Sequence, residues 1–188
     1  MNTPSNPLFG LAPSPWIERF AHLVPRGARV LDVAAGRGRQ ARLFASRGAT
    51  VLAIDRDAAA LAASAHVAGV TTQVADLEAG TWPLAGRMFD AIVVVHYLHR
   101  ALFPHLLAAL TDEGVFLYET FAAGNGAFGR PTNPDFLLQP GELLAVVQNR
   151  LTVVAFEQGL VDLADGHAVV QRIAAIGPRR PWPPPVAA

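Results

Sequence analysis

Short runs rich in β-branched residues and leucine alternate along this chain with longer alanine-rich stretches. The runs at 29–33, 50–54, 70–74, 89–95 and 115–121 have the length of buried strands, and most of the intervening stretches have the length of helices. This alternation is typical of a doubly wound α/β domain, in which helices cover both faces of a mostly parallel sheet. The run at 89–95 is the most apolar, as expected for a strand that helices bury from both sides.

Helix boundary signals support this interpretation. The expected helices cover 14–23, 38–47, 57–69, 104–110 and a short segment from 140 onward. Ser14 followed by Pro15 fits the N-cap and first position of the first helix, and Asp57 fits the N-cap of the third. Gly48 stands where the second helix needs a left-handed C-terminal cap.

The end of the chain predicts a change in strand direction. Runs at 151–156 and 168–176 are separated by a turn at Asp165 and Gly166, and strands joined by so short a link should pair antiparallel. The last residues, 178–188, are rich in proline and should form a flexible tail. The chain then divides into a leader at 1–13, a folded domain at 14–177 and the tail at 178–188.

One segment predicts a long loop. Between 122 and 139 the chain is rich in glycine, asparagine and proline, with the apolar residues Phe128, Phe136 and Leu137 as expected anchors. Loops of this length are uncommon within compact domains unless they are functional. We therefore expect this loop to cover a site.

Composition narrows the chemistry that the domain can perform. The 188 residues are 52% hydrophobic and 16% charged, which fits one folded domain. Lysine and cysteine are both absent, which excludes Schiff-base chemistry, thiolate nucleophiles, disulfides and cysteine-based zinc sites. No residue is proposed as a metal ligand.

Charge and hydropathy constrain the partners. The formal net charge is zero, which argues against binding to nucleic acid by phosphate neutralisation. The sequence contains no apolar run of bilayer-spanning length and no signal-peptide pattern at its start. We expect a cytoplasmic protein with no nucleic-acid or membrane partner. On this interpretation a solvated face, not a polyanion-binding patch, is formed by Arg26, Arg29, Arg37, Arg39, Arg42 and Arg47.

The first candidate binding element follows the first predicted strand. Asp32 stands near the end of that strand, and Ala34, Ala35, Gly36 and Gly38 form a turn of small residues that opens a helix. Residues without bulky side chains let the backbone approach a ligand closely. A carboxylate at the end of a buried strand needs a positively charged or hydrogen-bond-donating group near it. A cationic ligand group would meet that need.

Two further acids end the second and third predicted strands. Asp55 lies 17 residues beyond Gly38, where a carboxylate can accept both hydroxyl hydrogens of a ribose. Asp76 can accept from the exocyclic amine of adenine while Leu77 packs on the ring. A single such aspartate is more often a helix N-cap or a turn residue. Three acids at successive strand ends predict a shared nucleoside site, because these ends meet at one edge of the sheet.

The junctions resemble those of class I S-adenosylmethionine-dependent methyltransferases over residues from about 14 to 176. The family's turn follows the pattern acid-x-Gly-x-Gly-x-Gly, and here Ala34 replaces the first glycine. The resemblance implies a three-layer, doubly wound Rossmann-like sheet of seven mostly parallel strands with an antiparallel C-terminal hairpin. It also implies S-adenosylmethionine as the cofactor. Similarity to small bacterial methyltransferases related to the tellurite-resistance group lies in segments 118–121, 129–134 and 140–143.

The same resemblance implies roles for individual residues. Asp32 would face the methionine ammonium group and Asp55 the ribose, while Asp76 and Leu77 would hold the adenine. The backbone after the fourth strand would line the sulfonium end of the cofactor. The expected cofactor-binding residues are Asp32, Ala34, Gly36, Gly38, Asp55, Arg56, Asp76, Leu77, Val95 and His96.

The nearest alternative is a nucleotide-dependent oxidoreductase that uses NAD(P). Residues 36–41 also fit the Gly-x-Gly-x-x-Gly/Ala fingerprint, and the spacing to Asp55 suits either class. Two observations favour the methyltransferase: Asp32 would repel a pyrophosphate, and the chain has little length for a second substrate domain. A third hypothesis is a non-catalytic S-adenosylmethionine-binding module.

The methyl acceptor is expected to be a small molecule. The sequence lacks the strand-four motif of DNA methyltransferases that act on amino groups. It also has no lysine, which the ribose-methylating RNA enzymes need, and no cysteine, which the cytosine C5 enzymes use as a nucleophile. A sulfonium methyl group is already electrophilic, so an acid–base motif is not required. A monomer or homodimer is expected, and the excess of alanine, arginine and proline over lysine suggests a GC-rich bacterial genome.

The candidate catalytic residues are His96, Tyr97 and Glu119. His96 has the best position for a general base because imidazole titrates near neutral pH. A histidine at a strand end is, however, more often held by hydrogen bonds in a structural role. Further candidates for the acceptor pocket are His99, Tyr118, Asn125, Phe128 and Arg130.

Overall fold

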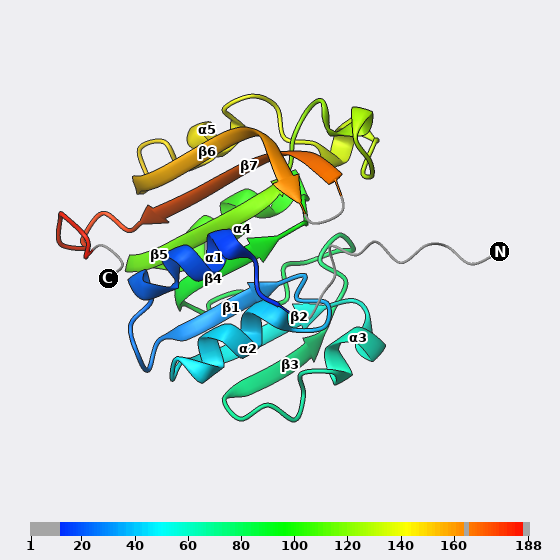
Figure 1. The fold of residues 1–188 in the computed structure, drawn as a ribbon. Coiled ribbons are helices and arrows are strands. Elements are labelled where there is room, and N and C mark those ends of the chain that lie inside the picture. The colour runs from blue at the N-terminus through cyan, green and yellow to red at the C-terminus, as the bar shows by residue number, and fades with distance from the viewer. Residues whose placement is uncertain (1–11, 164–165, 186–188) are drawn as a thin grey trace.

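A seven-stranded sheet forms the centre of the computed structural model, which describes residues 12–163 and 166–185 (Figure 1). The strands are β1 (Arg29–Val33), β2 (Thr50–Asp55), β3 (Val70–Val74), β4 (Phe89–Val95), β5 (Leu110–Phe121), β6 (Thr152–Leu163) and β7 (Gly166–Ile176). Their order is β3-β2-β1-β4-β5-β7-β6. The strands β1 to β5 are parallel, and β7 runs antiparallel to both β5 and β6. The predicted mixed sheet with its C-terminal hairpin is confirmed.

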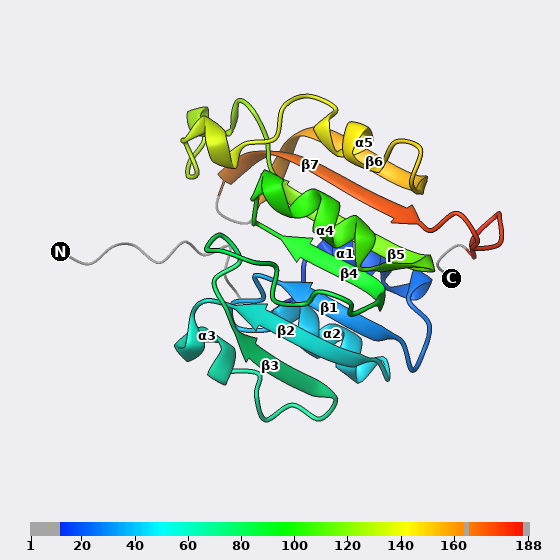
Figure 2. The same ribbon diagram turned by 180° about the vertical axis from the view of Figure 1, so that it is seen from behind.

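Helices cover both faces of this sheet. They are α1 (Pro15–Phe20), α2 (Arg39–Ser46), α3 (Ala58–Ala62), α4 (Phe103–Ala108) and α5 (Glu142–Val147). The opposite views of Figures 1 and 2 show α1 and α2 on one face and α4 and α5 on the other. Two apolar clusters follow from this arrangement, because alternate residues of the central strands point to opposite faces.

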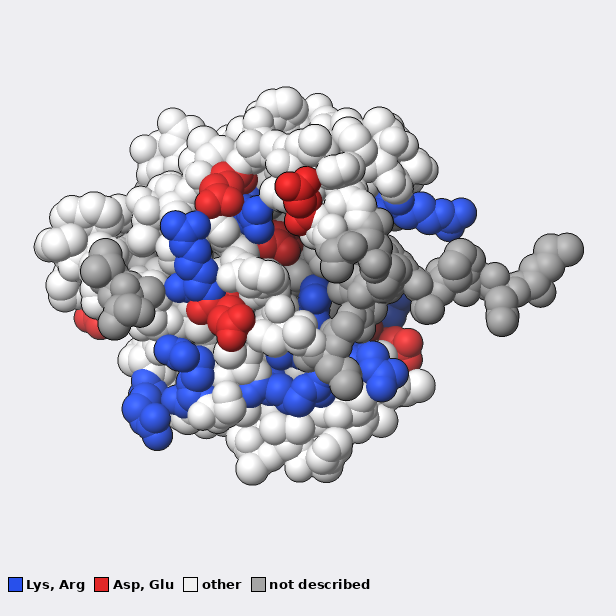
Figure 3. Space-filling model, viewed as in Figure 1, with Lys and Arg blue, Asp and Glu red and all other residues white. Residues whose placement is uncertain are grey.

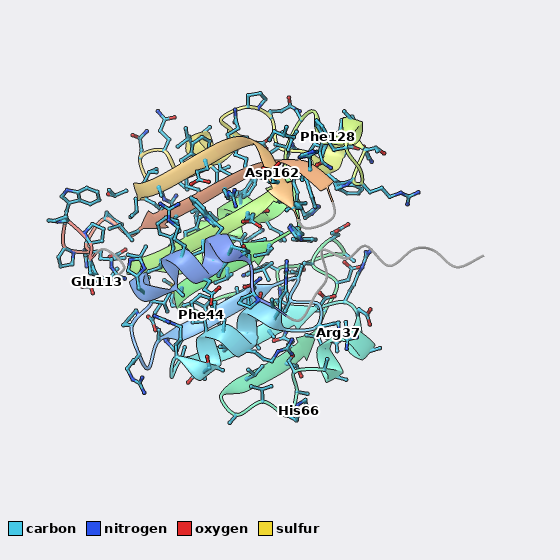
Figure 4. All side chains as sticks on the ribbon, in the orientation of Figure 1. Arg37, Phe44, His66, Glu113, Phe128 and Asp162 are labelled. Atoms are coloured by element: carbon cyan, nitrogen blue, oxygen red, sulfur yellow. The ribbon has the colours of Figure 1, made fainter. Side chains whose placement is uncertain are left out.

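Local capping signals fix the ends of α1 and α2. The Ser14 hydroxyl accepts a hydrogen bond from the Ile17 amide at 3.4 Å, as its N-cap position predicts. Gly48 has a φ of 87° and donates its amide hydrogen to Ala45, which ends α2 with the expected left-handed residue. Within α2, Phe44 is fully buried on the side of the helix that faces the sheet (Figure 4).

The third helix is shorter than the sequence predicts. It ends at Ala62 and does not continue to the region of Gly69. The Ser64 hydroxyl donates to the Leu61 carbonyl at 3.2 Å, an interaction that competes with the helical pattern. Ser64 is also fully buried, and it packs so closely against Gly38 of the glycine turn that a Cβ at Gly38 would collide with its side chain. Tertiary packing therefore ends this helix.

The loop between β5 and α5 is held differently from the prediction. Phe128 and Phe136 are each 48% exposed and are not the anchors. Leu137 and Leu138 are buried, and Asn125 is only 1% exposed. Two short 3-10 helices, Asn125–Ala127 and Pro134–Phe136, lie within the loop.

The described part of the proline-rich tail contacts the domain. Arg180 donates to the carbonyl oxygens of Leu23 and Glu113, and the His22 ring lies 3.0 Å from the Pro185 carbonyl. Most of the expected leader at 1–13 and the turn residue Asp165 lie outside the described residues. In the part of the chain that the structure describes, no helix is long and apolar enough to cross a membrane.

Arginine side chains gather over α2 and its flanking turns on the face shown in Figure 3. Arg26, Arg37 and Arg47, which flank α2 in the sequence, are exposed, which fits a solvated basic face. The absence of a nucleic-acid partner stays a prediction.

Candidate active site

A cavity of about 740 Å³ lies at the carboxyl ends of the parallel strands. Its volume is within the range usual for small-molecule sites. The side formed by the ends of β1, β2 and β3 consists of Ala34, Gly36, Asp55, Arg56 and residues 75–78. The opposite side consists of residues 95–98 after β4, Thr120 and Phe121 of β5, and residues 130–133 and Phe136 of the following loop.

The glycine turn after β1 shapes the first wall. Ala34, Gly36 and Gly38 all have positive φ, at 51°, 52° and 70°. The Gly36 amide donates to Asp55 Oδ2 at 2.7 Å, which ties the turn to the end of β2. Gly38 is the N-cap of α2, and its lack of a side chain leaves room for Ser64. Gly38 does not line the cavity. The turn therefore leaves backbone open to a ligand, as a tight nucleoside site requires.

Asp55 and Asp76 face the same cavity from adjacent strand ends. The second Asp55 oxygen, Oδ1, accepts from the Asp57 amide at 2.9 Å, and Asp76 accepts from the Glu78 amide at the same distance. These bonds fix both carboxylates in place. Each carboxylate retains acceptor capacity, since an ionised carboxyl has about four lone-pair sites.

Asp32 lies beneath this wall and does not line the cavity. Its side chain is buried, and Oδ2 accepts from the Ala41 amide at 2.9 Å near the start of α2. Burial, with a smaller contribution from the charge of Asp55, raises the pKa of Asp32 to about 7, although the Ala41 hydrogen bond and the charge of Arg39 oppose the rise. The structure thus brings Asp55 and Asp76 together in the cavity and places Asp32 behind them.

His96 occupies the junction between β4 and the cavity. It has a φ of 57°, which is uncommon for a residue with a side chain, and its ring stacks on Phe121 with the ring centres 4.8 Å apart. Nδ1 lies 3.3 Å from the Arg39 guanidinium, which can only donate, and Nε2 lies 3.7 Å from Glu119 Oε1. Burial lowers the pKa of His96 to about 4, with Arg39 adding to the effect. The ring is therefore neutral at pH 7.

Glu119 is buried on β5 and belongs to the wall behind His96, not to the cavity surface. Its Oε2 accepts from the Ser14 hydroxyl at 3.1 Å and lies 3.5 Å from Arg172. Burial raises the pKa of Glu119, and Arg172 and Ser14 oppose that shift. Glu119 therefore joins the N-cap of α1 to the strand that carries the site.

Tyr97 lines the cavity next to His96. Burial raises the pKa of its hydroxyl, and the neighbouring Glu78 carboxylate adds to the rise. The hydroxyl therefore remains protonated at neutral pH and can donate a hydrogen bond. The backbone carbonyl of Tyr97 accepts a hydrogen bond from the Tyr118 hydroxyl at 2.7 Å, which holds this segment against β5.

The loop between β5 and α5 supplies a wall of the cavity, in agreement with its expected place over a site, but sequence reasoning named only Arg130 among its lining residues. Of the other acceptor-pocket candidates, Arg130 lines the cavity, whereas His99, Tyr118, Asn125 and Phe128 do not. Phe128 instead meets His167 at the edge of the hairpin, and Figure 4 shows it high on the loop. The lining residues that were not predicted as site residues are Ala75, Glu78, Leu98, Thr120, Phe121, Pro131, Thr132, Asn133 and Phe136. The only sequence signal for the loop residues is their place in a long, proline-punctuated loop after a strand.

Two polar side chains, the buried Asn125 and the exposed Arg100, hold that loop in position. Asn125 donates to the Pro131 carbonyl at 3.2 Å and accepts from the Val169 amide at 3.1 Å. Arg100 binds Glu142 at 2.7 Å and also donates to the carbonyl oxygens of Asp135 and Leu137. The loop is a wall of the cavity with fixed attachments on both sides of the lining residues.

A second cavity of about 540 Å³ lies at the opposite edge of the sheet, over the amino ends of β1 to β3. It exists because residues 75–88, which connect β3 to β4, contain no helix to cover that face. Ligands of open α/β sheets bind beyond the carboxyl ends of the strands, so the first cavity is the candidate active site. Within the described residues, no three His, Cys, Asp or Glu side chains are grouped so as to hold a metal ion.

Comparison with known proteins agrees with this geometry. Residues 30–114 match a family model described as a methyltransferase domain. A comparison with curated proteins gives no match.

Solved structures share the fold. TehB from Haemophilus influenzae superposes with a TM-score of 0.70 at 16% identity, over 86% of this chain and 60% of that one. An S-adenosylmethionine-dependent methyltransferase from Mesorhizobium loti gives 0.67 at 18% identity, over 89% and 100%. A TehB-like S-adenosylmethionine-dependent methyltransferase from Corynebacterium glutamicum gives 0.62 at 20% identity, over 87% and 89%. This chain thus spans three fifths of the length of the H. influenzae protein.

The sheet order and the antiparallel C-terminal hairpin give a Rossmann-like fold that the solved methyltransferases share. Together with the methyltransferase-domain match over residues 30–114, this fold supports a class I S-adenosylmethionine-dependent methyltransferase, with S-adenosylmethionine as the cofactor. The open glycine turn and the two carboxylates in the cavity fit the backbone, ribose and adenine contacts that this cofactor needs.

Proposed function

We propose that this protein transfers a methyl group from S-adenosylmethionine to a small-molecule acceptor bound in the 740 Å³ cavity. The observation that carries the proposal is the convergence of Asp55 and Asp76 on one cavity beside the glycine turn. When bound, the cofactor supplies an electrophilic methyl group, so the protein mainly has to align the two reactants and exclude water.

The cofactor would occupy the side of the cavity formed by β1, β2 and β3. Asp55 binds the ribose hydroxyls, while Asp76 and Leu77 hold the adenine. Asp32 acts from behind the turn on the methionine ammonium group, through its charge. The remaining contacts come from Ala34, Gly36, Arg56, Val95 and His96, which line the cavity, and from Gly38, which shapes the turn.

The acceptor would occupy the side formed by β4, β5 and the following loop. Of the candidate catalytic residues, Tyr97 can donate a hydrogen bond to the acceptor, as its protonated hydroxyl favours. His96 contributes a neutral ring and its backbone, and Glu119 positions His96 from behind. The volume of the cavity, which is within the range usual for small-molecule sites, favours a small molecule over a macromolecular chain.

Calorimetric titration tests this function. We expect S-adenosylmethionine to bind with micromolar affinity and NAD not to bind, because NAD brings a pyrophosphate to the carboxylates of the turn. Asp55→Ala should weaken S-adenosylmethionine binding by about 1–3 kcal/mol, since the ribose loses charge-assisted hydrogen bonds. Asp162→Ala is a matched control, because Asp162 is an exposed aspartate at the far end of β6 that binds only His167 among the described residues. Tighter binding of NAD than of S-adenosylmethionine would contradict the proposal.

A further inference from the structure

The charged residues of the cavity are divided between its two sides. The side assigned to the cofactor carries the carboxylates of Asp55, Asp76 and Glu78, together with Arg56. The opposite side carries Arg130 as its only formally charged lining residue at pH 7 among the residues that the structure describes. The excess of acids suits the sulfonium and ammonium charges of the cofactor. The one anionic group of the cofactor is its methionine carboxylate, and the methionine end is assigned to the glycine turn on the first side, which leaves the cation on the other side for the acceptor.

Arg130 is exposed and forms no ion pair within the described residues. The backbone that carries it is nevertheless fixed, because Asn125 binds the carbonyl of the next residue, Pro131, at 3.2 Å. An arginine on a fixed segment, unpaired and at the wall of a cavity, can meet an anionic group of a ligand.

The remaining surface of this side is mainly apolar and aromatic. Phe121, Tyr97, Leu98 and Pro131 line it, and Phe136 is 48% exposed at its rim. A large apolar side chain exposed at a cavity rim is a natural contact for an apolar ligand. The acceptor side therefore combines an apolar body with one positive charge.

Among the described residues, this side has no unengaged group placed to take a proton from the acceptor. The cavity carboxylate that meets it, Glu78, interacts with the Tyr97 hydroxyl, which donates a hydrogen bond to it. His96 has its Nδ1 facing the donating Arg39 guanidinium at 3.3 Å, so Nε2 carries the hydrogen and points to Glu119. An acceptor that enters as an anion needs no such base.

We propose that the acceptor is an organic anion with an apolar, preferably aromatic, body, and that Arg130 is the residue that selects for its charge. The inference rests on the proposed function. The ionised acceptor atom bonds to the methyl carbon while the carbon–sulfur bond breaks, the electron pair stays on sulfur, and no proton passes to the protein. A carboxylate or a thiolate can serve as such an anion.

Binding of matched probes tests the selection without turnover. Benzoate and its neutral counterpart benzamide are titrated by NMR into the complex with S-adenosylhomocysteine. We expect benzoate to bind about fivefold more tightly than benzamide. Arg130→Ala should remove that preference, and Arg150→Ala, which changes an exposed arginine outside the cavity, should keep it. Equal affinities in the unsubstituted protein, no binding of benzoate, or an unchanged preference in Arg130→Ala would overturn the proposal.

Turnover distinguishes the two anions. Release of S-adenosylhomocysteine is measured with thiophenol and benzoate, and with aniline as the neutral amine. We expect turnover with at least one anion and little with aniline. Faster turnover with aniline than with both anions would overturn the inference while leaving the proposed function intact. Failure of the protein to bind S-adenosylmethionine at all would instead contradict the proposed function.

Discussion

The position of His96 shows how one residue serves the site without acting as a base. Its nitrogen atoms face Arg39 and Glu119. Burial lowers the pKa of the ring to about 4, so the ring is neutral at pH 7. The backbone of the same residue turns at a φ of 57° and lines the cavity. Position and backbone shape, more than basicity, are what this histidine provides.

His96→Asn tests that interpretation. Asparagine tolerates positive φ better than most residues, so the backbone should be retained. We expect the rate of S-adenosylhomocysteine release to fall by less than about tenfold, whereas loss of a general base usually lowers rates by about 10²–10⁴. The comparison is made by steady-state kinetics with the fastest acceptor of the panel, and a thousandfold loss in a folded variant would assign His96 a direct role in proton transfer.

We expect Asp32 to make cofactor binding depend on pH. Its pKa of about 7 lies above the ordinary value of 3.8, so the folded protein binds more protons than the unfolded chain between these values. Within that range stability falls as the pH rises, because the buried carboxyl must then ionise. A cationic ligand group placed near it reverses the preference and lowers the pKa.

We therefore predict proton release when S-adenosylmethionine binds. At pH 7 about half a proton should leave the protein, since that is the protonated fraction of a group with a pKa near 7. Calorimetry in two buffers of different ionisation enthalpy measures this number. The binding enthalpy of the Asp32→Asn variant should be the same in both buffers. An identical buffer dependence in the variant and the unsubstituted protein would show that the ionisation of Asp32 does not change when the cofactor binds.

The helix α1 is coupled to the active-site strand through its own N-cap. Ser14 both caps the helix and donates to the buried Glu119 at 3.1 Å, whereas Asp57 caps α3 at the surface through the Ala60 amide. Ser14→Ala removes the cap and one donor to a buried carboxylate. We expect a loss of unfolding free energy of about 2–3 kcal/mol for Ser14→Ala and about 1 kcal/mol for Asp57→Ala.

Urea denaturation of the two variants provides that comparison. Equal losses would mean that the contact between Ser14 and Glu119 contributes nothing beyond the cap.

The elements predicted well are those whose signals are local. The residue ranges of β1, β3 and β4 agree with the sequence pattern, because each strand is bounded by turn residues and carries its own apolar run. The predicted end of α3 was wrong, because the true end depends on the packing of Ser64 against Gly38, which lies far away in the sequence. Of the predicted apolar anchors of the long loop, Leu137 is buried as expected, whereas Phe128 and Phe136 were wrong. The reason is similar, since Asn125 and Arg100 hold the loop by contacts that no local pattern encodes.

At the scale of the whole molecule, sheet order explains how much of the site could be predicted. Parallel neighbours bring the carboxyl ends of β1, β2 and β3 to one edge, so the convergence of Asp55 and Asp76 follows from topology alone. Topology does not say how deep a side chain lies, and Asp32 is buried behind the cavity that it was expected to line. The loop wall at 130–136 depends on how the chain folds back over β4 and β5, which the sequence does not specify.

A crystal structure of the complex with S-adenosylhomocysteine tests the central claim most directly. The account predicts the nucleoside in the cavity at the carboxyl ends of β1 to β4, with both ribose hydroxyls within about 2.6–3.2 Å of the Asp55 carboxylate and the adenine beside Asp76 and Leu77. A nucleoside bound at the opposite edge of the sheet, or one whose ribose makes no contact with Asp55, would contradict it.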